Sequence, residues 1–233
     1  MLLHGSNLHI LVRWLKSVKV QLTPSLPNSA NYALYYSQSE IITGLIDGRV
    51  QLGINLDSGM LYHYSIPDQI ATYVDITSQE LQHDLDTLCS KRNISPVELN
   101  LKPVTQEGID TFREFATPAS RLLEAFKFSL TEPRSQVYLW GHNFDFDLVV
   151  YPEENKQVDI GISPGDSNHP RPYVYITPRP FDESKAHGKL LYGKWIFEPW
   201  KGIQMEWSEL SVLPMSQALD VLFQLFRQCR SMI

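Results

Sequence analysis

The sequence predicts a single α+β domain (residues 1–233) in which a mostly antiparallel sheet packs against two or three amphipathic helices. Segments with the two-residue alternation of strands occupy the first third of the chain and return in the last third. The segments between them, and the end of the chain, carry apolar residues at helical spacing. Strands are therefore grouped before and after helices, whereas a regular alternation of strand and helix would predict a parallel sheet.

The beginning of the chain is predicted to form short elements. Leu8–Leu15 has the composition of a short helix or strand. Ser17–Thr23 is predicted as a half-buried strand, because Val18, Val20 and Leu22 alternate with polar residues.

An antiparallel meander is expected next. Asp47-Gly48 and Asp57-Ser58-Gly59 supply its turns, because glycine tolerates the positive φ that tight hairpins need. The segments in order are a loop over Pro24–Ser29, strand-forming residues over Tyr32–Ile46, and strands over Val50–Leu56 and Met60–Ile66.

The middle of the chain is predicted to be helical. Thr77-Ser78-Gln79-Glu80 matches a capping box that opens a helix with its leucines on one face. A second helix is expected from Thr105, and Pro118 should kink or restart it, with Thr117 as the new cap. A short strand is predicted between the two helices, over Glu98–Leu101.

The last third returns to strands and closes on a helix. Pro214 is expected to open that helix, with Met215, Leu219, Leu222 and Phe226 on one face. The predicted strands are Gln136–Trp140, Phe144–Tyr151, Tyr173–Thr177, Leu190–Phe197 and Gly202–Trp207.

Composition excludes several classes of protein. The 233 residues are 43% hydrophobic and 20% charged, as in an ordinary folded protein. The net charge of -6 argues against a dedicated binder of nucleic acid or of an anionic membrane. No apolar run approaches the ~18 residues that cross a bilayer, and the start of the chain lacks the pattern of a signal peptide. Two isolated cysteines, Cys89 and Cys229, favour a reduced, cytoplasmic setting.

Familiar catalytic motifs are missing from the sequence. It contains no phosphate-binding glycine loop, no dinucleotide fingerprint, no His-Glu-x-x-His and no Gly-x-Ser-x-Gly. The seven histidines are scattered and none pairs at ligand spacing. No cofactor is therefore predicted.

The most suggestive polar pattern lies in residues 140–148. Asn143, Asp145 and Asp147 should share one face of a strand while the alternate residues face the core. Such a row could hold Mg²⁺ or Ca²⁺, with His142 or Asp159 as further ligands, and close carboxylates would raise one pKa as a general acid requires. The alternative, which we favour from the sequence, is a solvated outer face of the sheet.

A second pattern combines aromatic rings and arginine. Tyr173 and Tyr175 share a strand face near Arg179, and this set could line a ligand pocket. The favoured alternative is an aromatic core edge, with the surrounding prolines marking an edge strand. Tyr62-His63-Tyr64 is a weaker pattern of the same kind and is expected within a hairpin strand.

Several short motifs resemble a bacterial family known only as a domain of unknown function. Typical members carry Thr-Leu-His, Asn-His-Trp-Trp-His, Phe-Trp-Gly-Ser-Phe-Asp, Gly-Phe-Trp-Pro-Gly and Tyr-x-Tyr-x-Tyr-Pro-x-Pro. The matching pieces here are Asn7-Leu8-His9, Asn28-Ser29-Ala30-Asn31-Tyr32, Leu139-Trp140-Gly141, Gly161-Ile162-Ser163-Pro164-Gly165 and Tyr173–Pro180.

The resemblance implies a fold but no reaction. The family's histidine and tryptophan cluster is largely replaced here, by Ser29–Tyr32 and by Ile162-Ser163. Either Asp145 or Asp147 stands where the family has its acidic residue. If the matching positions line a pocket, then His9, Asn28 and Trp140 join Tyr173, Tyr175 and Arg179 as candidate ligand-binding residues.

These patterns lead to three hypotheses. The leading one is a non-catalytic module that binds a small ligand or a protein partner, or that assembles as a homo-oligomer. The rival is a metal-assisted hydrolase that uses Asp145 and Asp147, with His142 or Asp159. The third is a structural protein without a site.

Overall fold

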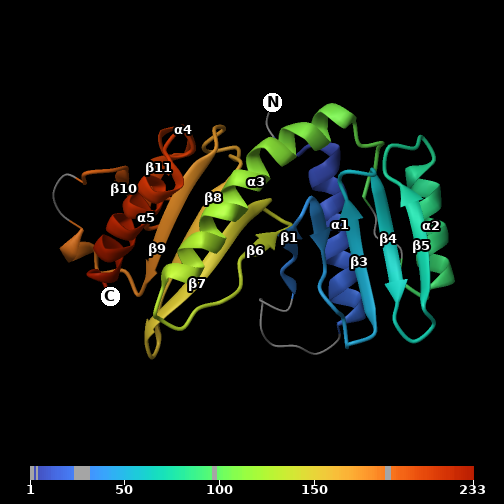
Figure 1. Ribbon diagram of the computed structural model, residues 1–233, viewed down its shortest axis with the longest axis horizontal. Helices are drawn as coiled ribbons and strands as arrows, with labels where there is room; N and C mark the ends of the chain where they lie inside the picture. Colours follow the sequence, from blue (N-terminus) through green and yellow to red (C-terminus); the bar gives the residue numbers. More distant parts are fainter. Residues whose placement is uncertain (1–2, 4, 24–31, 96–98, 187–189) are drawn as a thin grey trace. The chain divides into compact units, whose positions relative to one another are not determined.

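The computed structural model describes residues 3, 5–23, 32–95, 99–186 and 190–233. The fold is α+β with two antiparallel sheets, which confirms the predicted class (Figure 1). Contacts within the chain group into two compact units. The first unit comprises Leu3–Thr117 and Tyr138–Phe144, and the second comprises Pro118–Val137 and Asp145–Ile233.

The first unit opens with one long helix, α1 (Asn7–Leu22), where a strand was predicted over residues 17–23. Ser6 caps it by accepting a hydrogen bond from the backbone N–H of His9. The buried residues Leu8, Leu11, Leu15 and Val18 repeat at three- and four-residue spacing. This helical stripe prevails over the alternation of Val18, Val20 and Leu22, since Val20 is 39% exposed.

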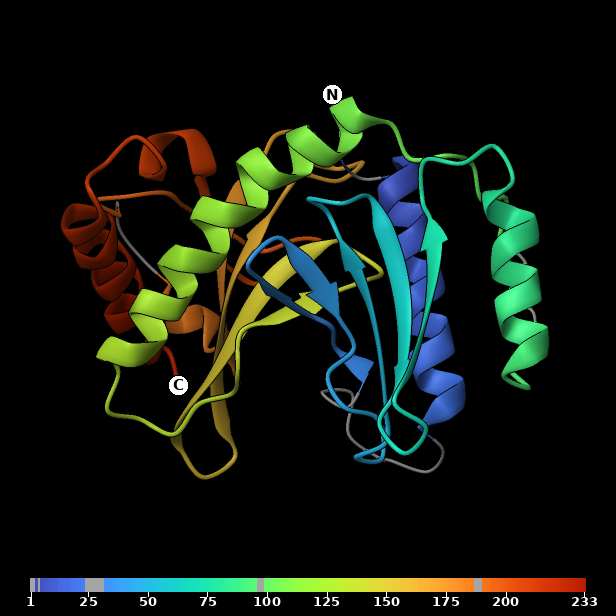
Figure 2. The ribbon, with the colours of Figure 1, turned by 45° about the vertical axis from the view of Figure 1, so that its right-hand side comes forward.

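The predicted meander is confirmed in the first sheet, whose strands pair antiparallel in chain order. Asp47 and Gly48 both have positive φ, as the predicted hairpin turn requires. Helix α1 lies behind this sheet in Figures 1 and 2. The strands are β1 (Tyr35–Ser37), β2 (Glu40–Ile42), β3 (Val50–Asn55), β4 (Met60–Ser65) and β5 (Ile70–Asp75), of which β5 was not predicted.

Helix α2 (Leu81–Lys91) follows as predicted, but the capping box does not form. The cap residue is Glu80, and the hydroxyl of Ser78 accepts a hydrogen bond from its backbone N–H. The predicted strand over Glu98–Leu101 is also wrong for its described part, since residues 99–101 are irregular, while Glu98 lies outside the described residues.

Helix α3 (Gln106–Ser129) runs through Pro118 without interruption. The predicted restart with a Thr117 cap is therefore wrong, and the hydroxyl of Thr117 instead lies 3.1 Å from that of Tyr36. The boundary between the two units nevertheless falls between Thr117 and Pro118.

A short return of the chain completes the first unit. Strand β6 (Tyr138–Trp140) forms a bridge between Leu139 and Leu34. Phe144 was predicted to begin the next strand, but it has a φ of +65° and precedes that strand. Its ring stacks on Phe112 at 4.4 Å and on His9 at 5.0 Å, in the core of the first unit.

The second unit holds five strands of the second antiparallel sheet, in the order β10-β11-β9-β8-β7. Strand β9 was predicted at an edge but is central. It contains Pro178, which lies beyond the residues that pair with β11. The strands are β7 (Asp145–Glu153), β8 (Lys156–Ser163), β9 (Tyr173–Arg179), β10 (Lys194–Ile196) and β11 (Gly202–Glu206), of which β8 was not predicted.

Helix α5 (Met215–Arg230) covers the apolar face of this sheet and contacts β8, β9 and β11. Leu222 and Phe226 are buried as predicted, whereas Met215 is 45% exposed. The smaller elements of this unit are η2 (Glu183–Lys185) and α4 (Trp207–Leu210). Within the part of the chain that the structure describes, no helix has the length and apolar character needed to cross a membrane.

Candidate functional site

The predicted aspartate row lies on the face of the second sheet opposite α5. Asp147 pairs with Gly161 on β8, and Gly161 pairs in turn with Tyr175 on β9. Directly opposed residues in an antiparallel sheet place their side chains on the same face. Asp145 and Asp159 share this face by the two-residue period of the strands. We call Asp145, Asp147, Asp159, Tyr173 and Tyr175 the acid–tyrosine face.

The carboxylates of this face are buried. Asp145, Asp147 and Asp159 are each only 5–6% exposed. The favoured prediction of a solvated outer face is therefore wrong. One physical reason is the aromatic cover, since Tyr175 lies over the sheet and meets the ring of Trp200 edge-on at 6.2 Å.

Asp145 is a buried acid whose pKa is raised. The hydroxyl of Tyr175 donates a 2.5 Å hydrogen bond to its Oδ2, while Oδ1 finds no hydrogen-bond partner among the described residues. Burial raises the pKa of Asp145 to about 6, and the hydrogen bond from Tyr175 opposes that rise. A carboxyl group that titrates near neutral pH can give or take a proton as a general acid or base.

A glycine makes room for the tyrosine ring. A Cβ atom at position 161 would lie 2.0 Å from Cζ of Tyr175 and 2.2 Å from its hydroxyl oxygen. The ring therefore crosses β8 where a side chain is missing, and this path brings its hydroxyl to Asp145 on β7. Burial and the neighbouring acids raise the pKa of Tyr175 well above its usual value, so the hydroxyl keeps its proton.

A second tyrosine–carboxylate pair lies beside the first. The hydroxyl of Tyr173 donates a 2.8 Å hydrogen bond to Asp166. The other oxygen of Asp166 accepts hydrogen bonds from the backbone N–H groups of Asn168 and His169. This carboxylate therefore organises the turn between β8 and β9, and its role is structural.

Asp159 is paired with an arginine. Nη2 of Arg179 lies 2.8 Å from Oδ2 of Asp159, and the guanidinium is largely in solvent, with 64% of the side chain exposed. Burial raises the pKa of Asp159, and Arg179 counteracts part of that effect. Arg179 thus neutralises an acid of the face at its solvent side.

The hypothetical cation site is not assembled by the residues that the structure describes. Among them, no three His, Cys, Asp or Glu side chains come together as a group that could hold a metal ion. Asp145 is committed to Tyr175, and Asp159 to Arg179.

The remaining candidates fall in the first unit. His9 is 2% exposed, and its Nδ1 accepts a hydrogen bond from the backbone N–H of Gly5, so it stabilises the start of α1. His142 lies in the turn after β6, with the ring of Trp140 edge-on at 6.0 Å. Asn28 lies outside the described residues.

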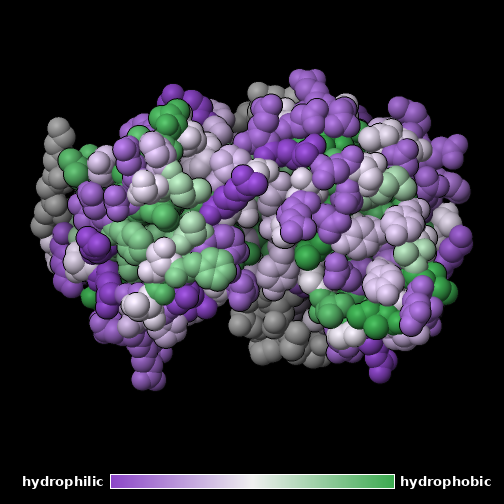
Figure 3. Space-filling model, viewed as in Figure 1, coloured by the Kyte–Doolittle hydropathy of each residue, from purple (hydrophilic) through white to green (hydrophobic). Residues whose placement is uncertain are grey.

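A site that the sequence pattern indicated only weakly lies on the first sheet, on the face turned away from α1. A hollow on this face has a volume of about 620 Å³, compared with about 380 Å³ for a hollow in the second unit. Figure 3 shows this face toward the viewer, and residues of intermediate hydropathy gather over β3, β4 and β5. We call it the tyrosine hollow, and it is lined by Glu40, Gln51, Asn55, Ser58, Met60, Tyr62, Tyr64, Ala71 and Tyr73.

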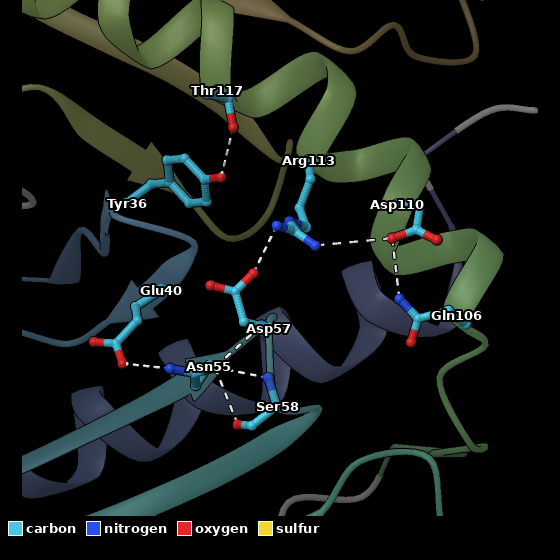
Figure 4. Close-up of polar contacts among 9 residues, drawn as sticks. All are labelled: Tyr36, Glu40, Asn55, Asp57, Ser58, Gln106, Asp110, Arg113 and Thr117. Carbon is cyan, nitrogen blue, oxygen red and sulfur yellow. Dashed lines mark hydrogen bonds and ion pairs between the residues drawn. The ribbon is translucent and has the colours of Figure 1, made fainter.

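The polar groups of the tyrosine hollow are held by one another. Nε2 of Gln51 donates to the hydroxyl of Tyr62, which donates to Glu40. The amide of Asn55 donates to Glu40 and accepts from the backbone N–H groups of Asp57 and Ser58 (Figure 4). The rim is thereby fixed, while Tyr73 and Tyr64 remain 62% and 38% exposed.

In the tyrosine hollow, as on the second sheet, a glycine leaves space for a tyrosine ring from the neighbouring strand. A Cβ atom at Gly53 would lie 2.5 Å from Cζ of Tyr62, which sits opposite it on β4. In the sequence, the alternation of Met60, Tyr62 and Tyr64 with core-facing residues indicates that these three side chains share one face of a strand. The tyrosine hollow also needs Tyr73 on β5, a strand that the sequence did not predict.

Comparisons of the chain with protein-family models, with curated proteins and with solved structures find no match. The proposed function therefore rests on the geometry and chemistry of the acid–tyrosine face and the tyrosine hollow.

Proposed function

We propose that this protein is a non-catalytic module that binds a small organic ligand in the tyrosine hollow. The observation that supports this function is a hollow of about 620 Å³ that combines exposed tyrosine rings with hydrogen-bonded amide groups. Sites for small molecules typically join an apolar or aromatic wall to a few fixed polar groups.

The charge of the lining restricts the ligand. Among the residues that the structure describes, Glu40 is the only charged one in the lining, and no lysine, arginine or histidine joins it. A tyrosine face attracts cations, and amides bind hydroxyl groups. The expected ligand is therefore positively charged or neutral, and anions should be rejected.

A thermal-shift screen of metabolites sorted by charge tests the proposal. Cationic or neutral compounds should raise the Tm, and Tyr73→Ala or Tyr64→Ala should abolish the shift without unfolding the protein, because both side chains are exposed. Tyr151→Ala is the matched control, since Tyr151 is 44% exposed on β7 of the second unit. The absence of any ligand-induced shift, together with a strict monomer in light scattering, would contradict both the ligand-binding and the assembly forms of the hypothesis.

Hydrolysis at the Asp145/Asp147 face is a second candidate function. It is favoured by Asp145, whose pKa of about 6 suits proton transfer and whose Oδ2 is fixed by Tyr175. Release of p-nitrophenol from ester and phosphate substrates, with and without Mg²⁺, would test it. Activity should inflect near pH 6 and disappear in Asp145→Asn, whereas equal rates in the wild type and the variant would exclude this function.

A further inference from the structure

A second, basic hollow lies in the first unit, along one side of α1. It has a volume of about 350 Å³ and is lined by Arg13, Lys16, Ser17, Val20 and His142. The four helical residues are spaced at i, i+3, i+4 and i+7, so they lie on one face of α1. We call this the basic hollow.

Gly141 brings His142 to the helix. A Cβ atom at position 141 would lie 3.2 Å from Cβ of Lys16 and 3.3 Å from the carbonyl oxygen of Val12. The turn after β6 therefore rests directly on α1, and Nδ1 of His142 comes within 3.4 Å of Nζ of Lys16. The close approach of two basic side chains is thus built by backbone packing.

The ionisable groups that the structure places in the lining of the basic hollow are all basic. Within the described ranges, the ion pairs include none to Arg13, Lys16 or His142. Burial and then Arg13 lower the pKa of Lys16. Burial, then Lys16 and then Arg13 lower the pKa of His142. The positive charges of Lys16 and Arg13 disfavour protonation of His142, whose neutral Nδ1 can accept a hydrogen bond from Nζ of Lys16, and an anion placed between the three side chains would offset those charges.

We propose that the basic hollow binds the phosphate group of a small, soluble phosphate monoester. Arg13 offers a planar set of donors, Lys16 a point charge, and His142 a further donor when it is protonated. The hollow is large enough for a phosphate group and a few attached atoms, and Val20 is the single apolar side chain among its described lining residues. The overall charge of -6 disfavours an anionic membrane as the source of the phosphate.

Binding should be coupled to protonation of His142. The charged groups that face this imidazole, Arg13 and Lys16, both come from α1, and the ring of Trp140 is its uncharged neighbour. A bound phosphate offsets the two cations, so the pKa of His142 should rise and binding should be accompanied by proton uptake at this imidazole.

Titration of the full chain with inorganic phosphate at low ionic strength tests this site. Binding is followed through the imidazole NMR signals of His142, assigned with His142→Gln. Lys16→Met and Arg13→Gln should each weaken phosphate binding about tenfold. Lys102→Met, at an exposed position of the same unit, is the matched control and should leave the affinity within about twofold.

A phosphate site in the basic hollow and a diffuse attraction of phosphate to surface lysines give different results in this titration. Equal weakening by Lys102→Met, or unchanged binding in Lys16→Met, would overturn the proposal. Glycerol 3-phosphate should compete with phosphate, whereas preferential binding to vesicles that contain phosphatidic acid would overturn the assignment to a soluble ester. Tyr73→Ala should bind phosphate normally, so this inference stands or fails independently of the tyrosine hollow.

Discussion

The hydroxyl of Tyr175 donates a 2.5 Å hydrogen bond to a buried carboxylate oxygen of Asp145, although the two residues lie on strands separated by β8. The ring reaches that far because Gly161 leaves its path open. The pair therefore couples a packing feature to the protonation of an acid, and each part can be tested by substitution.

Asp145→Asn should stabilise the protein at neutral pH. In the folded chain the pKa of Asp145 is raised from 3.8 to about 6, so between these values the folded state holds more protons than the unfolded state. Its contribution to stability is present at low pH and is lost as pH rises through about 6. The shift corresponds to a cost on the order of 3 kcal/mol at pH 7. Asparagine removes that cost and can still accept from Tyr175.

Urea unfolding of the two proteins between pH 4 and pH 8 measures this effect. The difference in unfolding free energy should be small near pH 4 and grow toward pH 7. Asp220→Asn on the exposed side of α5 is the control for a general change in charge. A wild-type advantage that increases with pH would refute the assigned direction.

Gly161→Ala should destabilise the second unit through overpacking. The new methyl group would lie 2.0 Å from Cζ of Tyr175, whose hydroxyl is held by Asp145, so the ring must leave its position. Such changes typically cost about 1–3 kcal/mol. Gly53→Ala is the matched comparison and should cost less, because the corresponding approach to Tyr62 is 2.5 Å and its hydrogen bonds are longer.

The double variant Gly161→Ala/Tyr175→Ala provides a further check by calorimetry. Removal of the ring eliminates the clash, so the two changes should cost less together than the sum of the single variants. Strict additivity would mean that the ring is not the obstacle.

Arg179→Gln should destabilise the protein by about 1 kcal/mol at pH 7, because it leaves the carboxylate of Asp159 without its cation. The value is modest since most of the guanidinium is in solvent. Burial already raises the pKa of Asp159, and loss of Arg179 should raise it further. The penalty should therefore shrink in acid, where Asp159 is protonated in both proteins. Arg171→Gln, which removes a 3.5 Å pair to Glu206 from a more exposed arginine, should change unfolding by less.

Lys19→Met should abolish an alkaline rise in stability. Nζ of Lys19 is buried on α1, donates a 2.5 Å hydrogen bond to the carbonyl oxygen of Ala33, and has its pKa lowered by burial to about 8. Between pH 8 and 10.5 the unfolded chain holds more protons at this lysine, so stability from this group increases with pH. The wild type should therefore gain up to roughly 3 kcal/mol relative to the variant across this window. Parallel curves of unfolding free energy against pH for the two proteins would contradict it.

The elements that were predicted correctly are those whose signal is local. Asp47-Gly48 defines its hairpin through backbone conformation alone, and the final helix shows its apolar stripe in Leu222 and Phe226. Residues 17–23 were wrongly predicted as a strand. Their valines and leucine alternate over a stretch too short to distinguish the two-residue period of a strand from the 3.6-residue period of a helix, and the helix forms because its apolar residues pack along the whole length of α1.

The candidate sites depended on contacts that a single sequence does not contain. The alternation of Asp145 and Asp147 placed them on one face, but Asp145 is covered in part by Tyr175, which lies some thirty positions away in the chain. The tyrosine hollow needed the unpredicted β5, and the basic hollow needed the contact of Gly141 with α1. Register between distant strands decides such groupings, and it is not a property of local composition.

The return of residues 138–144 to the first unit also sets an order for biosynthesis. The ring of Phe144 stacks on those of His9 and Phe112, and the backbone N–H groups of Leu139 and Leu34 each donate a hydrogen bond to the other's carbonyl oxygen. When Thr117 has just left the ribosome, Leu139 and Phe144 have not yet emerged, so the first unit still lacks these contacts. The first unit can reach its final form only after residues 118–137 have been synthesised, so the opening segment of the second unit emerges before the first unit is complete.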